Sequence, residues 1–464
     1  MGADESRSPT VPMIPARGAL KAAALPLLAA LAACASAGDR PLPTAPSTAA
    51  AVADLKVDAA SLRLQPLKAI VIDARDGLDP DEIAVLAVLN SPDLRAKRAA
   101  AKISEAQVFD AGLLPDPQIT AGADFPSTPG AAVAYSLAVA LDIQALITRS
   151  SALAAAKASA RQADLDLLWA EWGTAQQARQ LAWTALTDEG RAIVLKRVAD
   201  QARDRAERSA AAAARGDISG PTVGSDLAVQ LDAQALLTTA EHDAAKARLD
   251  LNALLGLEPG VRAPLAAGPA PATYDPDAIA TAARQVADRR PDLLALKAGY
   301  QSQNAKLRQA ILSQFPLMNV TGNHARDNSD ISSNGVAASF ALPIFNGNRG
   351  QIAIEKATRE QLHEEYQARL DQTQAEVAAA QAELASAQRA VRELETSVPR
   401  LEAIAGQASA AYARGDIDSA AWLGLVQNAL SRRADLEDKR LAALQAEAAL
   451  ETALFLPPAE LRAS

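Results

Sequence analysis

Few residues of this chain have side chains suited to chemistry, and their spacing matches no catalytic or metal-binding pattern. The 464 residues include three histidines and one cysteine. No two of His242, His324 and His363 have a metal-ligand spacing, and no glycine-rich phosphate-binding loop is present. His363 stands beside Glu364 and Glu365 on a predicted surface helix, which is a solvated face by default. The sequence therefore predicts no catalytic residue, no metal site and no cofactor, and indicates that the protein is not an enzyme.

The single cysteine, Cys34, ends a segment that is typical of a secretion signal. Arg17 and Lys21 precede a short apolar run, which is the order of charge and hydropathy in a signal peptide. The run ends in Leu31-Ala32-Ala33-Cys34, which resembles the bacterial lipobox, whose cysteine is acylated after cleavage. This resemblance predicts a signal peptide over residues 1–33 and lipidation of Cys34. An ordinary signal peptide with an incidental cysteine is the alternative.

The segment after the cysteine predicts where the anchor holds the protein. Ala35 and Ser36 follow Cys34, and the absence of Asp there favours the outer membrane over the inner membrane. Residues 35–53 are rich in Pro, Ala, Ser and Thr, a composition typical of flexible linkers. We therefore expect residues 34–75 to form a lipid anchor and flexible tether.

The composition indicates long, closely packed helices. Hydrophobic residues make up 49% of the chain, much of it alanine, while aromatic residues make up only 3%. The formal net charge of -9 argues against nucleic acid, whose phosphate backbone needs a basic surface. No apolar run after residue 40 reaches the roughly 20 residues of a membrane-spanning helix. A membrane crossing would therefore need strands.

The chain contains two copies of one unit, because three landmarks recur at one constant offset along the sequence. The offset predicts a first structural repeat over 76–259, a linker over 260–275 and a second repeat over 276–464. Each copy opens with Asp and Pro, which are typical of a helix N-cap and first turn. The landmarks are Pro92-Asp93-Leu94 with Pro291-Asp292-Leu293, Pro117 with Pro316, and Arg215-Gly216-Asp217-Ile218 with Arg414-Gly415-Asp416-Ile417.

Each copy predicts the same order of elements: a helix, two strands, a very long helix, a tight turn and a returning helix. A helix of some 65 residues would be roughly 100 Å long, which excludes a compact globule. Pro399 falls inside the second long helix and predicts a kink or break there. The helices are expected at about 80–112 and 277–314, then 147–214 and 349–413, then 222–256 and 419–455.

The four predicted strands have apolar side chains on one face and small or polar side chains on the other. Alternation of this kind is typical of strands between lipid and water, although an ordinary half-buried hairpin would show it too. The fold class is therefore mainly α with a small β part. The alternating apolar positions are Ile119, Ala121, Ala123 and Phe125, then Tyr135, Leu137, Val139, Leu141 and Ile143, then Met318 and Val320, then Val336, Ala338, Phe340, Leu342 and Ile344.

At this level of detail the chain resembles the TolC-type outer membrane factor family, as a lipoprotein member. The resemblance implies a homotrimer with a long α-helical barrel and a shared 12-strand β-barrel, to which each chain gives four strands. It implies an exit duct for efflux or type I secretion, with a periplasmic adaptor and an inner-membrane pump as partners. The phrases that carry it are "SPDLRAKRAAAKISEAQVFDAGLLPDPQITAG", "RRPDLLALKAGYQSQNAKLRQAILSQFPLMNVTG", "ASFALPIFNGNRGQIAIEKA", "ARGDIS" and "ARGDID".

The resemblance also implies roles for the two turns. The matching turns of the family form the periplasmic tip that contacts the adaptor, and by that match the tip residues are Gly216, Ile218, Ser219, Gly415, Ile417 and Asp418. A helix reversal needs glycine for its backbone, so good helix termination is the simpler interpretation of the same residues. Acidic residues near the turns suggest an acidic ring or gate, and the candidates are Asp217, Asp226 and Asp416.

Two other interpretations stay open at the level of sequence. A periplasmic adaptor lipoprotein would have one helical hairpin between β-rich halves, in place of two tandem units. A structural coiled-coil lipoprotein of the envelope would show a sustained heptad and no paired strands. The expected location is the outer membrane, with a lipid anchor and with the helices extending into the periplasm.

Overall fold

The computed structural model describes residues 40–73, 75–128, 130–266, 274–315, 318–457 and 460. Cys34 and Pro316 lie outside the described residues, and so do the whole predicted signal peptide, residues 1–33, and residues 34–39 of the predicted anchor. The chain divides into two units, Met1–Ser47 and Thr48–Ser464. Every helix and strand given below belongs to the second unit.

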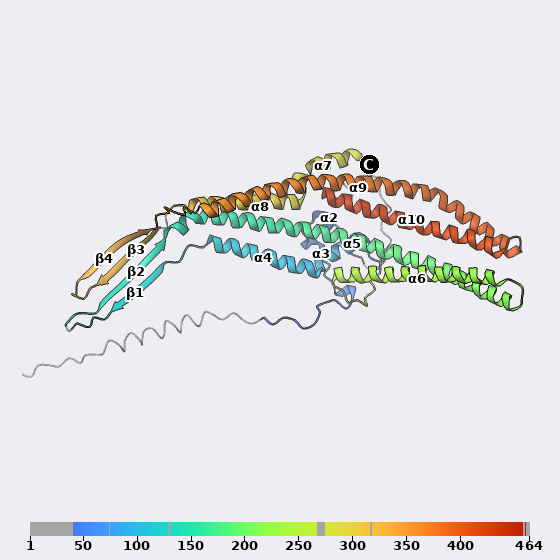
Figure 1. Ribbon diagram of the computed structural model, residues 1–464, viewed down its shortest axis with the longest axis horizontal. Helices are drawn as coiled ribbons and strands as arrows, with labels where there is room; N and C mark the ends of the chain where they lie inside the picture. The colour runs from blue at the N-terminus through green and yellow to red at the C-terminus, as the bar shows by residue number, and fades with distance from the viewer. Residues whose placement is uncertain are drawn as a thin grey trace, which may run out of the picture. The chain divides into compact units, whose positions relative to one another are not determined.

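The second unit is mainly α-helical with one small sheet, and its elements occur in tandem α-β-β-α order, as the sequence predicts (Figure 1). The first repeat runs from α3 to α6 and the second from α7 to α10. The bounds are η1 Val52–Asp54, η2 Ala59–Ser61, α2 Gln65–Lys68, α3 Pro80–Asn90, α4 Pro92–Gly112, β1 Gln118–Asp124, β2 Ala134–Asp142, α5 Ile143–Ala214, α6 Gly220–Leu255, α7 Pro276–Arg289, α8 Pro291–Leu312, β3 Met318–Arg326, β4 Ser332–Phe340, α9 Arg349–Arg414 and α10 Ser419–Leu454.

The opening helix of each repeat is two helices, and the single helices predicted over 80–112 and 277–314 are wrong on this point. The break falls before Pro92 in the first repeat and before Pro291 in the second. Proline lacks an N–H group and forces the preceding residue out of the helical region. Ser91 has a ψ of 126° and Arg290 a ψ of 124°, which are extended values. Both prolines therefore begin a new helix at its first position.

Two long helical hairpins follow the strands. In the first, α5 has 72 residues and α6 has 36; in the second, α9 has 66 and α10 has 36. At 1.5 Å per residue α5 is about 108 Å long. Because β2 leads directly into α5 at Asp142, the strands and the helix reversal lie at opposite ends of this helix (Figure 1).

The second long helix continues through Pro399, so a break is not observed there, and the predicted kink stays a prediction. A proline inside a helix costs roughly 3 kcal/mol, because one hydrogen bond is lost and the ring crowds the preceding turn. Val391 and Val398, which precede the proline, are buried in one cluster with Leu436 of α10. Each such side chain contributes about 1.5–3 kcal/mol on burial, which offsets the cost of the proline.

The four strands form one antiparallel sheet in the order β1-β2-β3-β4. Rows of facing residues run straight across it, for example Ile119, Val139, Gly322 and Val336. β4 ends at Phe340, so the strand predicted to continue through Leu342 and Ile344 is too long. No helix of the described residues is long and apolar enough to cross a membrane.

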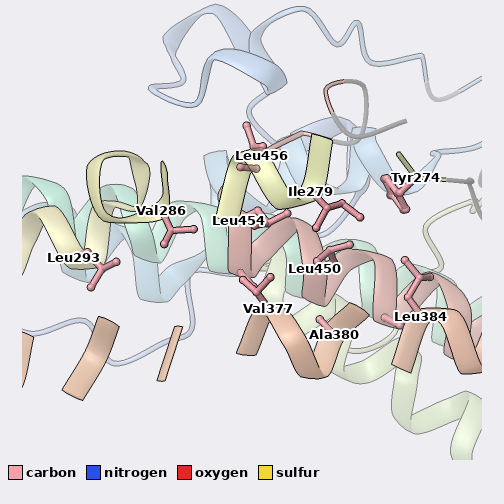
Figure 2. Close-up of a cluster of buried hydrophobic side chains, with 13 residues drawn as sticks. Tyr274, Ile279, Val286, Leu293, Val377, Ala380, Leu384, Leu450, Leu454 and Leu456 are labelled. Carbon is pink, nitrogen blue, oxygen red and sulfur yellow. The ribbon is translucent and has the colours of Figure 1, made fainter. Parts of the chain in front are cut away.

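The buried side chains gather in clusters that lie mostly within one repeat or the other. Side chains of α7, α8, α9 and α10 form one buried cluster with Tyr274 of the linker, including Ile279, Val377, Leu450 and Leu454 (Figure 2). Two further clusters join α3, α5 and α6, and α2, α3 and α5. Each repeat therefore has its own core, in which its long helix packs against shorter helices.

Part of the segment predicted as a flexible tether is packed. Leu55, Leu62, Leu64 and Leu67 are buried against α3 and its neighbours. Ala49 also exchanges backbone hydrogen bonds with Gly256 and Glu258 at the end of α6. The packed part of residues 34–75 therefore belongs to the first repeat, because leucines of the segment complete its core.

Candidate functional site at the two helix reversals

Each long hairpin reverses at a glycine with a left-handed backbone. Gly216 has a φ of 81° and Gly415 a φ of 79°. Apart from the glycine itself and its two chain neighbours, no described heavy atom lies within 4 Å of the position that a Cβ would take at either glycine. The requirement for glycine is therefore set by the backbone and not by crowding, because a left-handed conformation costs other residues about 1–2 kcal/mol.

The same hydrogen bonds close both reversals. The amide of the residue after each glycine reaches back five residues, and the amide of the glycine reaches back three, which is the Schellman arrangement. It satisfies carbonyl groups that a helix end leaves without partners. The bonds are Asp217 N to Ala212 O at 2.9 Å, Gly216 N to Ala213 O at 2.9 Å, Asp416 N to Ala411 O at 2.9 Å and Gly415 N to Tyr412 O at 3.0 Å.

An ion pair spans each turn. Arg215 lies 2.9 Å from Asp217, and Arg414 lies 2.8 Å from Asp416, in both cases between the guanidinium Nε and the carboxylate Oδ2. All four side chains are more than half exposed. Exposed pairs of this kind contribute at most about 1 kcal/mol. The turns therefore present matched charged groups to solvent and do not depend on them for stability.

The remaining tip residues start the returning helices. Asp418 caps α10 by accepting a hydrogen bond from Ala421 N at 2.8 Å. Ser219 precedes α6 without such a cap, and its hydroxyl lies 3.1 Å from Thr222 Oγ1. Ile218 and Ile417 are half-buried. Each turn thus combines one apolar side chain with exposed polar groups, a mixture suited to contact with another protein.

Asp226 lies inside the first hairpin and not with Asp217 at the turn. Its carboxylate is 2.8 Å from Arg205 Nε and accepts a hydrogen bond from Ser209 across the α5–α6 contact. Only 4% of Asp226 is exposed. A buried ion pair holds its partners in one geometry, because either charge alone would be costly to bury. Of the three acidic candidates, only Asp217 and Asp416 present carboxylates to solvent.

The second hairpin is held near its tip by aromatic packing. The rings of Tyr412 and Trp422 stack with centroids 4.7 Å apart, and Trp422 Nε1 donates to Ser409 Oγ at 3.0 Å. Sequence reasoning named neither Arg205 nor this stack. The spacing held a signal, because residues at similar distances before and after a reversal face each other. Arg205 and Asp226 are separated from Gly216 by almost the same number of residues, Arg205 before it and Asp226 after it.

Buried charged groups tie the two repeats together at mid-height. Arg179 of α5 lies 2.5 Å from Glu451 of α10, which also accepts from the Tyr274 hydroxyl at 2.9 Å. Burial raises the pKa of Glu451, although Arg179 opposes this shift. Burial also raises the pKa of Tyr274, as does the nearby Glu451 carboxylate. Trp172 and Trp183 of α5 are 3% and 4% exposed, and the Arg179 guanidinium lies 5.2 Å from the centre of the Trp183 ring.

Two of the three histidines contact a neighbouring side chain. His324 Nδ1 lies 2.7 Å from Asn334 Oδ1 between β3 and β4, and the His363 ring lies 6.4 Å from Tyr300. Within the described ranges, no group of three or more His, Cys, Asp or Glu side chains is placed to hold a metal ion.

Comparisons with known proteins agree with this architecture. Residues 282–454, from α7 to the end of α10, match the profile of the family described as Outer membrane efflux protein. A sequence comparison with curated proteins found no match.

Among solved structures, the chain is similar to the outer membrane channel CmeC of Campylobacter jejuni, with a TM-score of 0.68 and 14% identity over 91% of this chain and 94% of that one. The open state of the MtrE outer membrane channel of Neisseria gonorrhoeae gives a TM-score of 0.65 and 17% identity over 90% of this chain and 98% of that one. CusC, a protein that changes conformation on folding and transmembrane channel formation, gives a TM-score of 0.64 and 15% identity over 91% of this chain and 99% of that one.

These findings decide between the interpretations of the sequence. The predicted fold is confirmed and the second repeat matches the predicted family, while an adaptor with one hairpin or a coiled coil without strand pairs does not fit. The second repeat matches the outer membrane efflux protein family, and the chain as a whole has the fold of an outer membrane efflux channel.

Proposed function

We propose that this chain is one subunit of a homotrimeric exit duct, with its strands in the outer membrane and its helices in the periplasm. The sheet supports this most directly, because one face carries apolar side chains and β1 and β4 each have an unpaired edge within the described chain. Open sheet edges are not tolerated in lipid, and four strands do not close a barrel. Three copies supply twelve strands, so each edge pairs with the next copy.

The experiment that tests this function is the native mass of the detergent-extracted protein, by light scattering with the detergent subtracted. We expect three times the mass of the mature chain, and steady single-channel conductance in planar bilayers. A monomer in mild detergent would leave both sheet edges open and would contradict the duct.

The tips are the proposed contact with a periplasmic adaptor, which joins the duct to an inner-membrane pump. Gly216, Ile218 and Ser219 form one tip and Gly415, Ile417 and Asp418 the other, and both pair an apolar side chain with exposed polar groups. Replacing Ile218 and Ile417 by Glu should abolish co-purification with the adaptor while leaving the native mass unchanged. Unchanged co-purification would restrict these residues to turn formation.

Cys34 is the proposed lipid attachment site at the outer membrane, on the strength of its lipobox-like setting. Metabolic labelling with a palmitate analogue should label the protein, and Cys34→Ala should remove the label. A label that persists in the variant would exclude this site.

Asp217 and Asp416 are the proposed acidic ring, because each chain presents both carboxylates at its reversals. Rings of carboxylates favour cations at a constriction. Asp217→Asn with Asp416→Asn should lower the preference for cations in single-channel recordings. An unchanged conductance and selectivity would place the constriction elsewhere.

A further inference from the structure

The charged side chains of the sheet are sorted between its two faces. Residues that face each other across paired strands, and residues two apart on one strand, share a face. By this rule Asp124 and Asp142 lie on the face with the small side chains, whereas His324 and Arg326 lie on the apolar face with Val336. Arg326 is the one arginine in the four described strands, and these strands contain no lysine. The basic groups therefore stand on the side of the sheet that we place in lipid.

These basic groups lie at the edge of the apolar face, near the β3–β4 turn and far from the helices (Figure 1). Arg326 is the last residue of β3 and lies in one row with Tyr135 and Ser332. Gly322 lies in the row of Val336, so the two rows are about 13 Å apart along the strands. At a tilt of about 40° this is roughly 10 Å along the membrane normal, close to half the height of an apolar band about 25 Å tall. With Val336 near the midplane, the Arg326 row therefore reaches the lipid headgroups.

Three side chains that can donate hydrogen bonds gather at this edge. His324 Nδ1 lies 2.7 Å from Asn334 Oδ1, and the rings of His324 and Tyr135 have centroids 6.0 Å apart. Arg326 faces Tyr135 directly across the paired strands. Tyr135 is 41% exposed, the Arg326 side chain is 38% exposed, and His324 is exposed too. A phenol, an imidazole and a guanidinium are therefore accessible together on one face, and we call Tyr135, His324 and Arg326 the outer patch.

The ion pair that Arg326 makes within the chain does not prevent it from binding another anion. Its partner is Asp330 in the β3–β4 turn, and the two side chains are 38% and 60% exposed. Exposed pairs of this kind contribute little to stability, because water screens them. A phosphate monoester carries about two negative charges and three acceptor oxygens, and a guanidinium matches its geometry with two parallel hydrogen bonds. Phosphate is therefore a stronger partner for Arg326 than the Asp330 carboxylate.

The apolar rows beside the outer patch indicate that the phosphate belongs to a lipid. Leu137 lies in the row of His324, and Val336 lies in the next row toward the helices. They are 48% and 82% exposed, so an acyl chain that covers them removes apolar surface from water. A soluble anion gains nothing from these rows. A lipid satisfies both parts at once, because its headgroup and the start of its acyl chains meet at one level of the membrane.

We propose that the outer patch binds the phosphate headgroup of a lipid in the outward-facing leaflet. Arg326 holds the phosphate with two hydrogen bonds, and the Tyr135 hydroxyl donates a third. The imidazolium form of His324 donates from Nε2, because Nδ1 already bonds to Asn334. The acyl chains lie against the apolar rows. This inference rests on the proposed trimeric duct and adds one lipid site to the outer face of each copy.

Native mass spectrometry of the detergent-extracted trimer tests the site, with lipid A as the probe because its headgroup carries phosphate monoesters. Titration should give trimers with up to three bound lipids, one for each copy. Arg326→Gln should weaken the apparent affinity about tenfold, because a hydrogen bond to a charged group contributes enough free energy for such a change. Arg326→Lys should weaken it less, since lysine keeps the charge and loses the paired hydrogen bonds.

Two controls separate the site from an effect of charge alone. Ala325→Arg in the Arg326→Gln chain restores the net charge on the opposite face of β3, and it should not restore binding. Arg432→Gln is the matched control, because Arg432 is exposed and pairs with a nearby aspartate but lies on α10. This variant should leave the affinity for lipid A unchanged.

The probe is varied to identify the source of the phosphate. Lipid A without its phosphates should bind the native trimer as weakly as intact lipid A binds the Arg326→Gln trimer. Inorganic phosphate, at the concentration at which lipid A saturates the trimer, should not displace the lipid. Displacement would assign the outer patch to a free anion and overturn the lipid site.

The outcomes separate this inference from the proposed function. A trimer that binds lipid A and loses affinity with Arg326→Gln, but not with Arg432→Gln, supports the lipid site. A trimer with equal affinity in the native chain and in Arg326→Gln overturns the lipid site and leaves the duct intact. A monomer overturns both, because the apolar face of the sheet would then not lie in the membrane.

Discussion

Phe455 ends α10 with a left-handed backbone that its counterpart in the first repeat supplies with glycine. Phe455 has a φ of 52°, and Gly256 has a φ of 72° at the same position of α6. The phenyl ring packs 5.1 Å from the Trp172 ring and 6.4 Å from the Trp169 ring, both on α5. Such ring pairs contribute about 0.5–1.5 kcal/mol each, which offsets a backbone cost of about 1–2 kcal/mol.

This balance predicts an order of stability that does not depend on the size of the ring's contribution. Phe455→Ala loses the ring and keeps the strained backbone, whereas Phe455→Gly loses the ring and relieves the strain. The glycine variant should therefore be more stable than the alanine variant by about 1 kcal/mol. Thermal unfolding of the detergent-solubilised protein measures the difference. The reverse order would show that the backbone at Phe455 is not strained.

Asp292 predicts a pH dependence of stability. Burial opposes its charged form, but hydrogen bonds and charge from Arg290 and Arg369 outweigh burial and hold its pKa below the ordinary 3.8. Folding therefore favours the ionised form, so the stabilisation is present above pH 3.8 and is lost as the pH falls through the lower folded-state pKa. The Arg290 side chain is fully buried, and removing one partner of a buried pair costs about 3 kcal/mol.

The measurement compares the unfolding temperature of the native chain with that of Asp292→Asn as the pH is lowered from neutral. The variant should unfold at a lower temperature at neutral pH, and the gap should narrow only below about pH 4. A gap that stays constant to the lowest pH would mean that the carboxylate charge does not stabilise the fold.

At the scale of elements, the two hairpins use different chemistry at the same place. The first hairpin has the buried Arg205–Asp226 pair, and the counterparts of these residues in the second are Ile404 and Leu425, which are 45% and 40% exposed. The second hairpin is held closer to its tip by the Tyr412–Trp422 stack. The first hairpin therefore depends on one buried ion pair and the second on aromatic packing.

This difference predicts where each hairpin opens. Asp226→Ala leaves Arg205 without its carboxylate inside the α5–α6 contact, at a cost of about 3 kcal/mol. Hydrogen exchange should accelerate over residues 205–226 and stay unchanged in α9 and α10. Leu425→Ala, at the counterpart position, is the control and should change exchange little, because that side chain is already partly exposed. Equal effects of both variants would contradict the assignment.

Repetition and hydropathy predicted the order and kind of these elements, but not all of their limits. The constant offset between the repeats located both reversals, because glycine has a specific backbone role there. The breaks before Pro92 and Pro291 arise because a proline disfavours helical backbone at the residue before it. The hydropathy pattern did not predict these breaks, because it continues through both prolines. Continuation through Pro399 depends on burial against α10, and the end of β4 depends on pairing with β3. Such tertiary contacts are not visible in a local pattern.

The candidate site was predictable to a similar degree. The tip glycines could be named from the turn motif, and the structure gives them the left-handed backbone that a reversal needs. The cap that Asp418 provides for α10 was not predicted. Asp226 could not be told apart from Asp217, because burial depends on how α6 faces α5. The joint between repeats also escaped prediction, since Arg179 and Glu451 lie in different repeats, far apart in the chain.

At the scale of the whole molecule, the sheet distinguishes a membrane duct from a soluble hairpin protein. Val336 is the central residue of β4, lies in the row with Ile119 and Val139, and is 82% exposed in the single chain. Ala337 is its neighbour on the opposite face and is exposed too. In the proposed barrel, Val336 faces lipid and Ala337 faces water.

Arginine at these adjacent positions should therefore have opposite outcomes. Val336→Arg places a charge near the bilayer midplane at a cost of about 2–4 kcal/mol and should remove most trimer from the outer membrane fraction. Ala337→Arg adds the same side chain to the water-filled face, where its charge keeps its hydration, and should leave the amount of trimer unchanged. The amount of trimer in purified outer membranes decides the matter. Equal tolerance of both substitutions would mean that neither face meets lipid, whereas loss only with Val336→Arg requires lipid on the apolar face.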